Sequence, residues 1–346
     1  MAFSAINKGS SFQNQVLYTG NAGTQSITNL GFQPDLTWIK SRSASTYHSL
    51  SDSASGTDIQ LGVNDANAAD DFTTAITAFD SDGFSLGSNG NTNASAATFV
   101  GWNWKAGTTS GIATNGSTTI TPSAYSFNQT TGISIIKYTG NSTVGAKIPH
   151  GLGVAPKMII VKSTTNAYEW AVYHASLGAT KWVELQSAAA ASTGSIVWND
   201  TAPDSVNFTV ASNNRTNGSS TYVAYCFAEV SGFSNFGSYI GNGNVDGTFV
   251  YTGFKPSFLL IKTTGAEDSW RLWDNARNTY NVMDITLRPN TADGDYVAAA
   301  NNIDFLSNGF KLRTTSGGYN GSTDTLIYMA FGQPIISNSG TPATAR

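Results

Sequence analysis

The sequence predicts an all-β protein of three tandem antiparallel β-sandwich domains, jelly-roll-like in type, and two repeated phrases carry that prediction. In the first phrase a proline stands six residues before a lysine, with an apolar run between them, at Gly31–Lys40, Gly153–Lys162 and Gly253–Lys262. Proline is tolerated at the first residue of a strand but not inside it, so each phrase indicates a strand entered from a glycine turn. Because Met158–Val161 and Phe258–Ile261 show no polar alternation, both faces of that strand are expected to be covered.

The second phrase is a strand that closes each unit, at Thr98–Trp104, Thr221–Phe227 and Thr325–Phe331. Read with a period of two, one face carries large apolar side chains and the other mostly small ones. The large face holds Val100, Trp102 and Trp104, then Val223, Tyr225 and Phe227, then Ile327, Met329 and Phe331. We expect these residues to be buried and another layer to approach the small face closely.

Further strands are predicted between these markers. A Tyr-x-Gly-Asn phrase opens each unit, at Tyr18, Tyr138 and Tyr239, and glycine followed by asparagine is a turn signal. Asp82-Gly83 and Asn308-Gly309 lie between short apolar runs and predict hairpins. The middle unit offers the strand Asn207–Val210, and Ser187–Ala191 is expected to form a short turn of helix.

These markers divide the chain into an arm, three sandwich units, a join and a tail. The ranges are 1–14 for the arm, 15–106, 135–229 and 230–333 for the units, 107–134 for a linker or extra hairpin, and 334–346 for the tail. The join is rich in Thr, Ser and Gly, whereas the short stretch from Glu229 to Ser238, where the third unit begins, carries Phe233 and Phe236. The second and third units are therefore expected to abut.

Composition argues against several classes of protein. Charged residues are only 12 % of the 346, the net charge is −4, and no run of Lys or Arg occurs, so no nucleic-acid partner is expected. The single cysteine, Cys226, excludes an intrachain disulfide. The sequence has neither the apolar core of a signal peptide nor an apolar run long enough for a spanning helix. We expect synthesis and folding in a cytoplasm and no membrane insertion.

The candidates for chemistry all have a structural alternative that we prefer. His48 and His174 each follow a tyrosine, and Trp273-Asp274 stands at a similar place, so the histidines of separate sandwiches are not expected to share a metal. Glu169 and Glu184 could form a glycosidase pair, but the other units offer no equivalent. Asp80-Ser81-Asp82-Gly83 resembles the start of a calcium loop and is better explained as a hairpin turn. We therefore predict no catalytic, metal-binding or cofactor-binding residues.

Aromatic rings could also form sugar-binding shelves. Trp102 and Trp104 lie on the large face of a closing strand, where a core position is the preferred interpretation. Trp198, in a Trp-Asn-Asp-Thr phrase, falls in a predicted loop and is the one aromatic residue expected to be an exposed contact.

Several long phrases resemble a recurrent family of bacteriophage proteins that carries a repeated domain and is common in marine phage genomes. They include Tyr173–Lys181, Val197–Pro203, Thr221–Phe227, Phe233–Tyr239 and Ile303–Phe310, and the resemblance covers nearly all of residues 15–333. It implies a virion structural or tail-fibre-like protein, made in the cytoplasm of a bacterial host. The family has no known catalytic residues to transfer.

We therefore expect a non-enzymatic structural protein on the virion surface, most simply a capsid decoration protein with other virion proteins as partners. The alternatives are a tail-fibre or receptor-binding adhesin that contacts host surface glycans and, less favoured, a carbohydrate-active enzyme. The arm and tail have too few apolar residues to fold alone, so both are expected to hold the particle, and residues 2–14 are expected to be dispensable for folding. The particle-contact candidates are Phe3, Ile6 and Phe12 in the arm and Ile335 and Ile336 in the tail.

Overall fold

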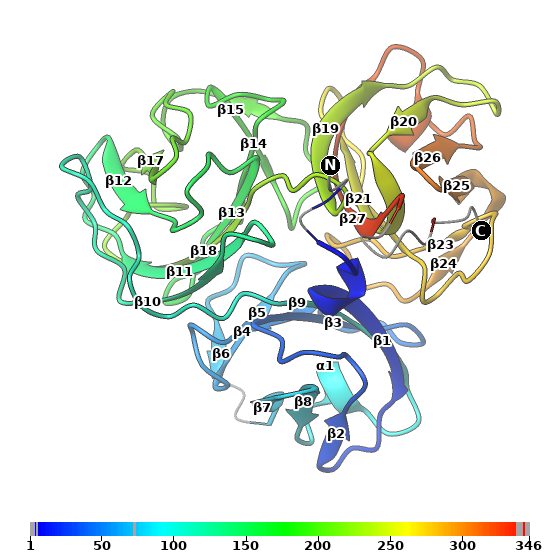
Figure 1. Cartoon of the computed structure of the whole chain (residues 1–346), viewed down its shortest axis with the longest axis horizontal. Helices are drawn as coiled ribbons and strands as arrows, with labels where there is room; N and C mark the ends of the chain where they lie inside the picture. Colours follow the sequence, from blue (N-terminus) through cyan, green and yellow to red (C-terminus); the bar gives the residue numbers. More distant parts are fainter. Residues whose placement is uncertain (1–3, 5, 72–73, 337–341, 343–346) are drawn as a thin grey trace.

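The computed structural model describes residues 4, 6–71, 74–336 and 342, and it is an all-β structure with several antiparallel sheets. Figure 1 shows three lobes around a common centre, which we define as the first lobe (13–106), the second lobe (107–229) and the third lobe (230–334). The described residues contain two short α-helices, α1 (Gly90–Asn93) and α2 (Gly317–Asn320). Ser187–Ala191 forms no helical turn, because that stretch is an irregular loop that leads into the strand Ser192–Thr193.

Each lobe contains a main sheet with one shared strand order. In the first lobe the order is β1 (Gln13–Thr19), β9 (Thr98–Trp104), β3 (Leu36–Ser41), β4 (Ser49–Asp52), β5 (Ile59–Gly62) and β6 (Asp70–Asp71). In the second it is β10 (Ala124–Asn128), β11 (Ile133–Thr139), β18 (Thr221–Phe227), β13 (Met158–Ser163), β14 (Ala171–His174), β15 (Lys181–Glu184) and β16 (Ser192–Thr193). In the third it is β19 (Ser234–Ile240), β27 (Thr325–Pro334), β21 (Phe254–Thr263) and β22 (Arg271–Asp274).

A smaller sheet lies in each lobe and contains the predicted hairpins. These sheets are β2 (Gln25–Ile27), β8 (Gly83–Leu86) and β7 (Ile76–Asp80); β12 (Ala146–Pro149) and β17 (Asn207–Val210); and β20 (Phe249–Tyr251), β26 (Gly309–Leu312) and β25 (Ile303–Leu306). The third lobe also has the pair β23 (Ile285–Thr286) and β24 (Tyr296–Val297). The predicted strand Asn207–Val210 is thus confirmed.

The strand register confirms that the three proline phrases occupy equivalent places. The residue two positions after each proline lies opposite the last aromatic residue of the closing strand: Leu36 with Trp104, Met158 with Phe227, and Phe258 with Phe331. Two of the strands begin after their proline, as predicted. In the third lobe Pro256 lies inside β21, at a register shift between Pro256 and Phe258.

The nine large residues of the closing strands are all buried, as predicted, but they do not fill three separate cores. They meet in one cluster that takes side chains from all three lobes. Three smaller clusters each lie within one lobe and include residues of its main and smaller sheets. The large face of each main sheet needs an apolar partner, and the large faces of the other two lobes supply it. The lobes therefore share a core, in contrast to the expectation of self-contained tandem domains.

Three fully buried lysines, Lys40, Lys162 and Lys262, join neighbouring lobes. Their Nζ atoms donate across the seams to backbone carbonyl oxygens, at 2.9 Å to Ala292, 3.1 Å to Ala66 and 2.9 Å to Ala188. Burial lowers the pKa of each ammonium group from 10.5 to about 8, and acidic neighbours oppose this shift. The lysine that ends each repeated phrase is thus a cross-lobe donor.

Two more bonds recur at the same three seams. Backbone N–H groups of Ala69, Ala191 and Asp295 donate to the carbonyls of Thr164, Thr264 and Arg42. Side chains also cross at the centre: Tyr225 Oη donates to Asp52 at 2.8 Å, Trp102 Nε1 donates to Asp274 at 3.0 Å, and His174 Nε2 lies 3.1 Å from the carbonyl of Tyr328. The seams are therefore sealed by polar as well as apolar contacts.

The Tyr-x-Gly-Asn phrases have a packing role rather than a simple turn role. Each tyrosine donates its hydroxyl to a backbone carbonyl just before a buried asparagine, namely Asn93, Asn217 or Asn320. A Cβ atom at Gly20, Gly140 or Gly241 would lie 2.1–2.2 Å from a backbone oxygen. These glycines are needed because the backbone approaches closely.

Replacing a large residue at the centre should strongly destabilise the protein. Trp104 is 1 % exposed and packs edge-on against Phe258 and Phe331. Trp104→Ala should lower the free energy of unfolding by roughly 3–5 kcal/mol through cavity formation. Urea unfolding measures this, with the exposed Leu17→Ala as control, and a loss at Trp104 no larger than the control's would contradict the shared core.

Stability should also fall in acid, partly through His174. Burial lowers the pKa of this histidine from 6.5 to about 4, and its Nδ1 accepts the N–H of Ser176. Between these values the unfolded chain binds more protons than the folded one, so stability is lost as pH falls from about 6.5 to 4. The contribution approaches about 3 kcal/mol. His174→Gln should flatten the pH dependence measured by urea unfolding, and an unchanged slope would be evidence against this assignment.

Candidate functional site

The three histidines are buried and have structural hydrogen bonds. His48 Nδ1 accepts the indole N–H of Trp38 at 3.1 Å, and His150 Nδ1 accepts the backbone N–H of Leu152 at 3.2 Å. Burial lowers the pKa of both, so each stays neutral. The expected equivalence of His48 and His174 is wrong: the register aligns His174 with Asp52, opposite the start of the proline strand.

The suspected glycosidase pair holds a guanidinium between its two carboxylates. Arg215 lies 3.3 Å from Glu169 Oε2 and 3.2 Å from Glu184 Oε1, so it occupies the space that a sugar would need. Asp82 accepts backbone N–H groups of Asn29 and Gly31, and Asp80 accepts the hydroxyl of Ser85, which fits the hairpin interpretation. Within the described residues no group of three or more His, Cys, Asp or Glu side chains could hold a metal ion.

Trp198 is not the exposed contact that its sequence predicted. It is 1 % exposed and packs edge-on against Tyr173, with ring centroids 5.9 Å apart, inside the second lobe. The loop that carries it folds back over the smaller sheet, so a polar flanking sequence does not imply an exposed ring. Cys226 is also fully buried, and burial raises the pKa of its thiol.

The N-terminal arm packs against the three lobes and is not a free segment available for contact with another protein. Ile6 is 1 % exposed in the shared core, and Phe12 packs edge-on against Phe233 of the third lobe. The first strand begins at Gln13, inside the predicted arm. The side chains of Ile6 and Phe12 therefore pack inside the molecule and do not serve as particle contacts. Removal of the arm is expected to impair folding. Phe3 lies outside the described residues.

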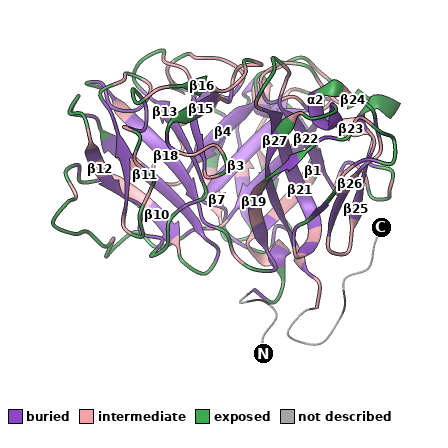
Figure 2. Ribbon diagram, turned by 90° about the horizontal axis from the view of Figure 1, so that it is seen from above, coloured by how far each residue is buried: buried purple, intermediate pink, exposed green. Residues whose placement is uncertain are grey.

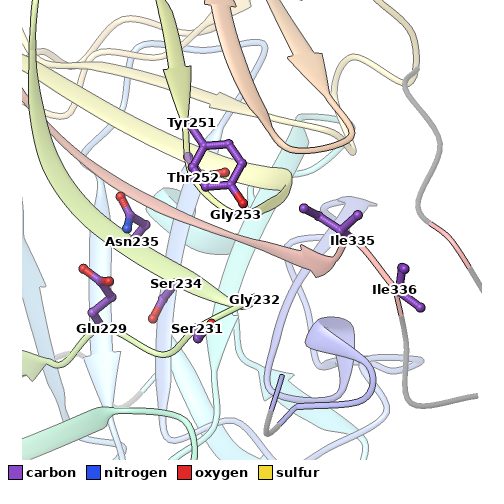
Figure 3. Close-up of a pocket in the computed structure, with 10 residues that line it drawn as sticks. All are labelled: Glu229, Ser231, Gly232, Ser234, Asn235, Tyr251, Thr252, Gly253, Ile335 and Ile336. Atoms are coloured by element: carbon purple, nitrogen blue, oxygen red, sulfur yellow. The ribbon is translucent and has the colours of Figure 1, made fainter. Parts of the chain in front are cut away.

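Ile335 and Ile336, by contrast, line a cleft with a volume of about 490 Å³. Figure 3 shows how three distant segments form it: Glu229–Asn235 at the start of β19, Tyr251–Gly253 at the end of β20, and the two isoleucines after β27. Both isoleucines are partly exposed, and Tyr251 is 62 % exposed. The cleft thus combines an apolar rim with an aromatic ring.

The polar groups of the cleft suit binding rather than reaction. Ser234 Oγ donates to the carbonyl of Ala228 and accepts the N–H of Val230, so it is not a free nucleophile. Asn235 Oδ1 accepts a hydrogen bond from the hydroxyl of Tyr328 at 2.5 Å, so this oxygen already has a donor within the protein. Burial and the negative charge of Glu229 raise the pKa of Tyr328 to about 12. The exposed Glu229 carboxylate is the one charged group of the cleft lining.

Sequence reasoning identified the two isoleucines but not the rest of the cleft. The segments Glu229–Asn235, Tyr251–Gly253 and Ile335–Ile336 lie far apart along the chain, and no spacing pattern links them. Only the two adjacent apolar residues in a polar tail gave a signal.

Comparison with known protein families gives a match over most of the chain. Residues 8–334 match the model of a family described as a domain of unknown function, DUF7483. No curated protein and no solved structure matches the chain. Within the described residues, no helix has the length and apolar character needed to cross a membrane.

Two isoleucine variants should separate folding from surface roles. Ile6→Ala should lower the free energy of unfolding by roughly 2–5 kcal/mol, because it opens a cavity in the shared core. Ile335→Ala, at a partly exposed cleft position, should cost less than about 1 kcal/mol. Urea unfolding of both variants tests this, and equal losses would contradict the assignment of the arm to the core.

Proposed function

The chain belongs to the DUF7483 family, and on that premise we propose that it is a non-enzymatic structural protein displayed on a bacteriophage particle, as a capsid decoration protein. The observation that carries the proposal is that the buried ionisable side chains make structural contacts between lobes. Lysines, carboxylates and a histidine make hydrogen bonds between lobes, and apolar side chains of all three lobes form the shared core. These contacts hold the three lobes in one fixed arrangement, as a structural protein requires.

One face of this body offers a means of attachment. Residues near both ends of the chain meet there: the N–H of Gly9 donates to Gln333 Oε1 at 2.9 Å, and Ser4 Oγ donates to the carbonyl of Ser231. The cleft borders these residues. Docking through this face would leave the opposite face directed outwards.

The finer architecture belongs to the same proposal. We infer that each lobe is one copy of a sandwich-like unit, because strand order and register recur in all three. Three similar lobes around one centre would present three similar surfaces to a lattice of identical subunits.

An adhesin is the second candidate, favoured by aromatic residues away from the cleft. Tyr296 of β24 is 43 % exposed, its neighbour Val297 is 60 % exposed, and the Arg288 guanidinium lies 4.5 Å from the Tyr296 ring centroid. Figure 2 has β24 at the upper edge of the molecule. An exposed ring beside a guanidinium suits stacking against a sugar.

Electron cryomicroscopy of purified particles from the virus that encodes the chain would test the proposal. We expect three-lobed density repeated over the head, with the face that carries Gly9 and Gln333 towards the shell. Density at the tail only, together with binding of purified protein to host cells that Tyr296→Ala abolishes, would favour the adhesin. Absence of the chain from the particles would refute both.

A further inference from the structure

The outer edges of the three main sheets are covered differently. β1, β11 and β19 occupy the same position, each next to the closing strand of its lobe. In the second lobe β10 adds a further strand outside β11, with pairs from Ala124–Lys137 to Asn128–Ile133. No described strand pairs with the outer side of β1 or β19.

The backbone of β19 has hydrogen-bonding groups that point away from its sheet. The N–H of Gly241 donates to the carbonyl of Asp324, and the carbonyl of Phe233 accepts the N–H of Gly332. The backbone N–H and C=O groups of odd-numbered residues in this stretch therefore point towards β27, and those of even-numbered residues point away from it. The N–H groups of Phe236 and Ser238 therefore point outwards, and neither donates to a described residue. Ser238 is exposed. Exposed edges of this kind accept strands from other chains.

β1 is less available, although it has the same position. The side chain of Gln15 donates to the carbonyl of Ser257 in the third lobe. The last carbonyl of each edge strand accepts a side chain, Thr19 from Gln25 and Ile240 from Thr248, so these two bonds do not distinguish the edges. The N–H of Gln15 is also used, by the side chain of Asn14. β19 is thus the more open of the two edges.

The cleft lies where an added strand would place a side chain. In the second lobe Phe127 of β10 pairs with Ser134, and its ring packs on Gly151, whose added Cβ would be 2.8 Å from the ring. The third-lobe counterparts of Ser134 and Gly151 are Asn235 and Tyr251. The first match follows from the register of the closing strands, the second from the spacing to the proline phrase. Both counterparts line the cleft.

We propose that β19 and the cleft bind an extended segment of a partner protein, which adds a strand outside β19 and places an aromatic side chain in the cleft. Main-chain hydrogen bonds to Phe236 and Ser238 would supply affinity, and the cleft would supply specificity. The segment alternates small polar and aromatic residues, as Ala124–Asn128 does. A basic residue beside the aromatic one would pair with Glu229.

This inference deepens the proposed function, which supplies only the identity of the partner as another virion protein. Binding itself can be tested without particles. Protein that binds the segment but is absent from virions would refute the proposed function and leave this inference standing.

The test adds a synthetic peptide with the sequence of residues 121–130 to the full-length protein and follows amide hydrogen exchange. We expect saturable protection of the amides of Phe236 and Ser238. A peptide with Phe127→Ala should bind roughly tenfold more weakly or worse, because the aromatic anchor is lost. Protection confined to another strand, or none at ~1 mM peptide, would overturn the proposal.

Two matched variants of β19 sharpen the result. Ser238→Pro removes an outward N–H without touching a sheet hydrogen bond, and proline is tolerated at such edge positions. It should weaken peptide binding roughly tenfold, whereas Ser238→Ala should bind like wild type. Equal binding by the proline variant would overturn the proposal. A dimer of the unliganded protein that only Ser238→Pro dissociates would assign the edge to a second copy and overturn the choice of partner.

Discussion

The buried lysine at the end of each proline strand is the interaction on which the three-lobed arrangement depends. Its stem crosses an apolar interior, and its Nζ reaches carbonyl oxygens of both its own lobe and the next, as Lys162 does with Tyr168 and Ala66. An ammonium group removed from water is tolerated only when its donors are satisfied. That requirement fixes the distance between a strand of one lobe and a loop of its neighbour. The apolar faces then have only one way to meet.

The seam between the first and third lobes joins two lobes that are not consecutive in the chain, and it thereby closes the ring of three lobes. It carries a partly buried ion-pair network that the other two seams lack within the described residues. Arg277 lies between Asp274 and Asp295, and Asp295 also binds Arg42 of the first lobe at 2.8 Å. Each charge in such a network requires its partners, because a buried charge left alone is strongly destabilising. The network therefore favours one register of closure over looser alternatives.

Much of this arrangement was predictable from sequence, because local rules and tertiary packing agree along the proline and closing strands. Alternation alone identified the buried face that includes Trp102 and Trp104. Sequence could not reveal that the three faces share one core, since periodicity shows which face is buried but not what covers it. The same limit explains the errors at Trp198 and Ile6, where polar neighbours suggested exposure and a remote segment supplies burial. The cleft was missed because no local pattern records the meeting of distant segments.

What recurs in the three lobes and what differs have separate physical explanations. The lysines, the Tyr-x-Gly-Asn phrases and the large closing faces recur because each lobe meets its neighbour in the same way. The edge strands have no such constraint, and they differ: β10 covers β11, side chains occupy β1, and β19 remains open beside the cleft. An uncovered edge exposes the protein to aggregation unless something pairs with it or blocks it. The exposed apolar side chains of Ile240 and Phe249, near this edge, increase the tendency to aggregate. An edge left open beside a cleft, in a molecule that covers the equivalent edge elsewhere with its own chain, is most simply explained as a place kept for another chain.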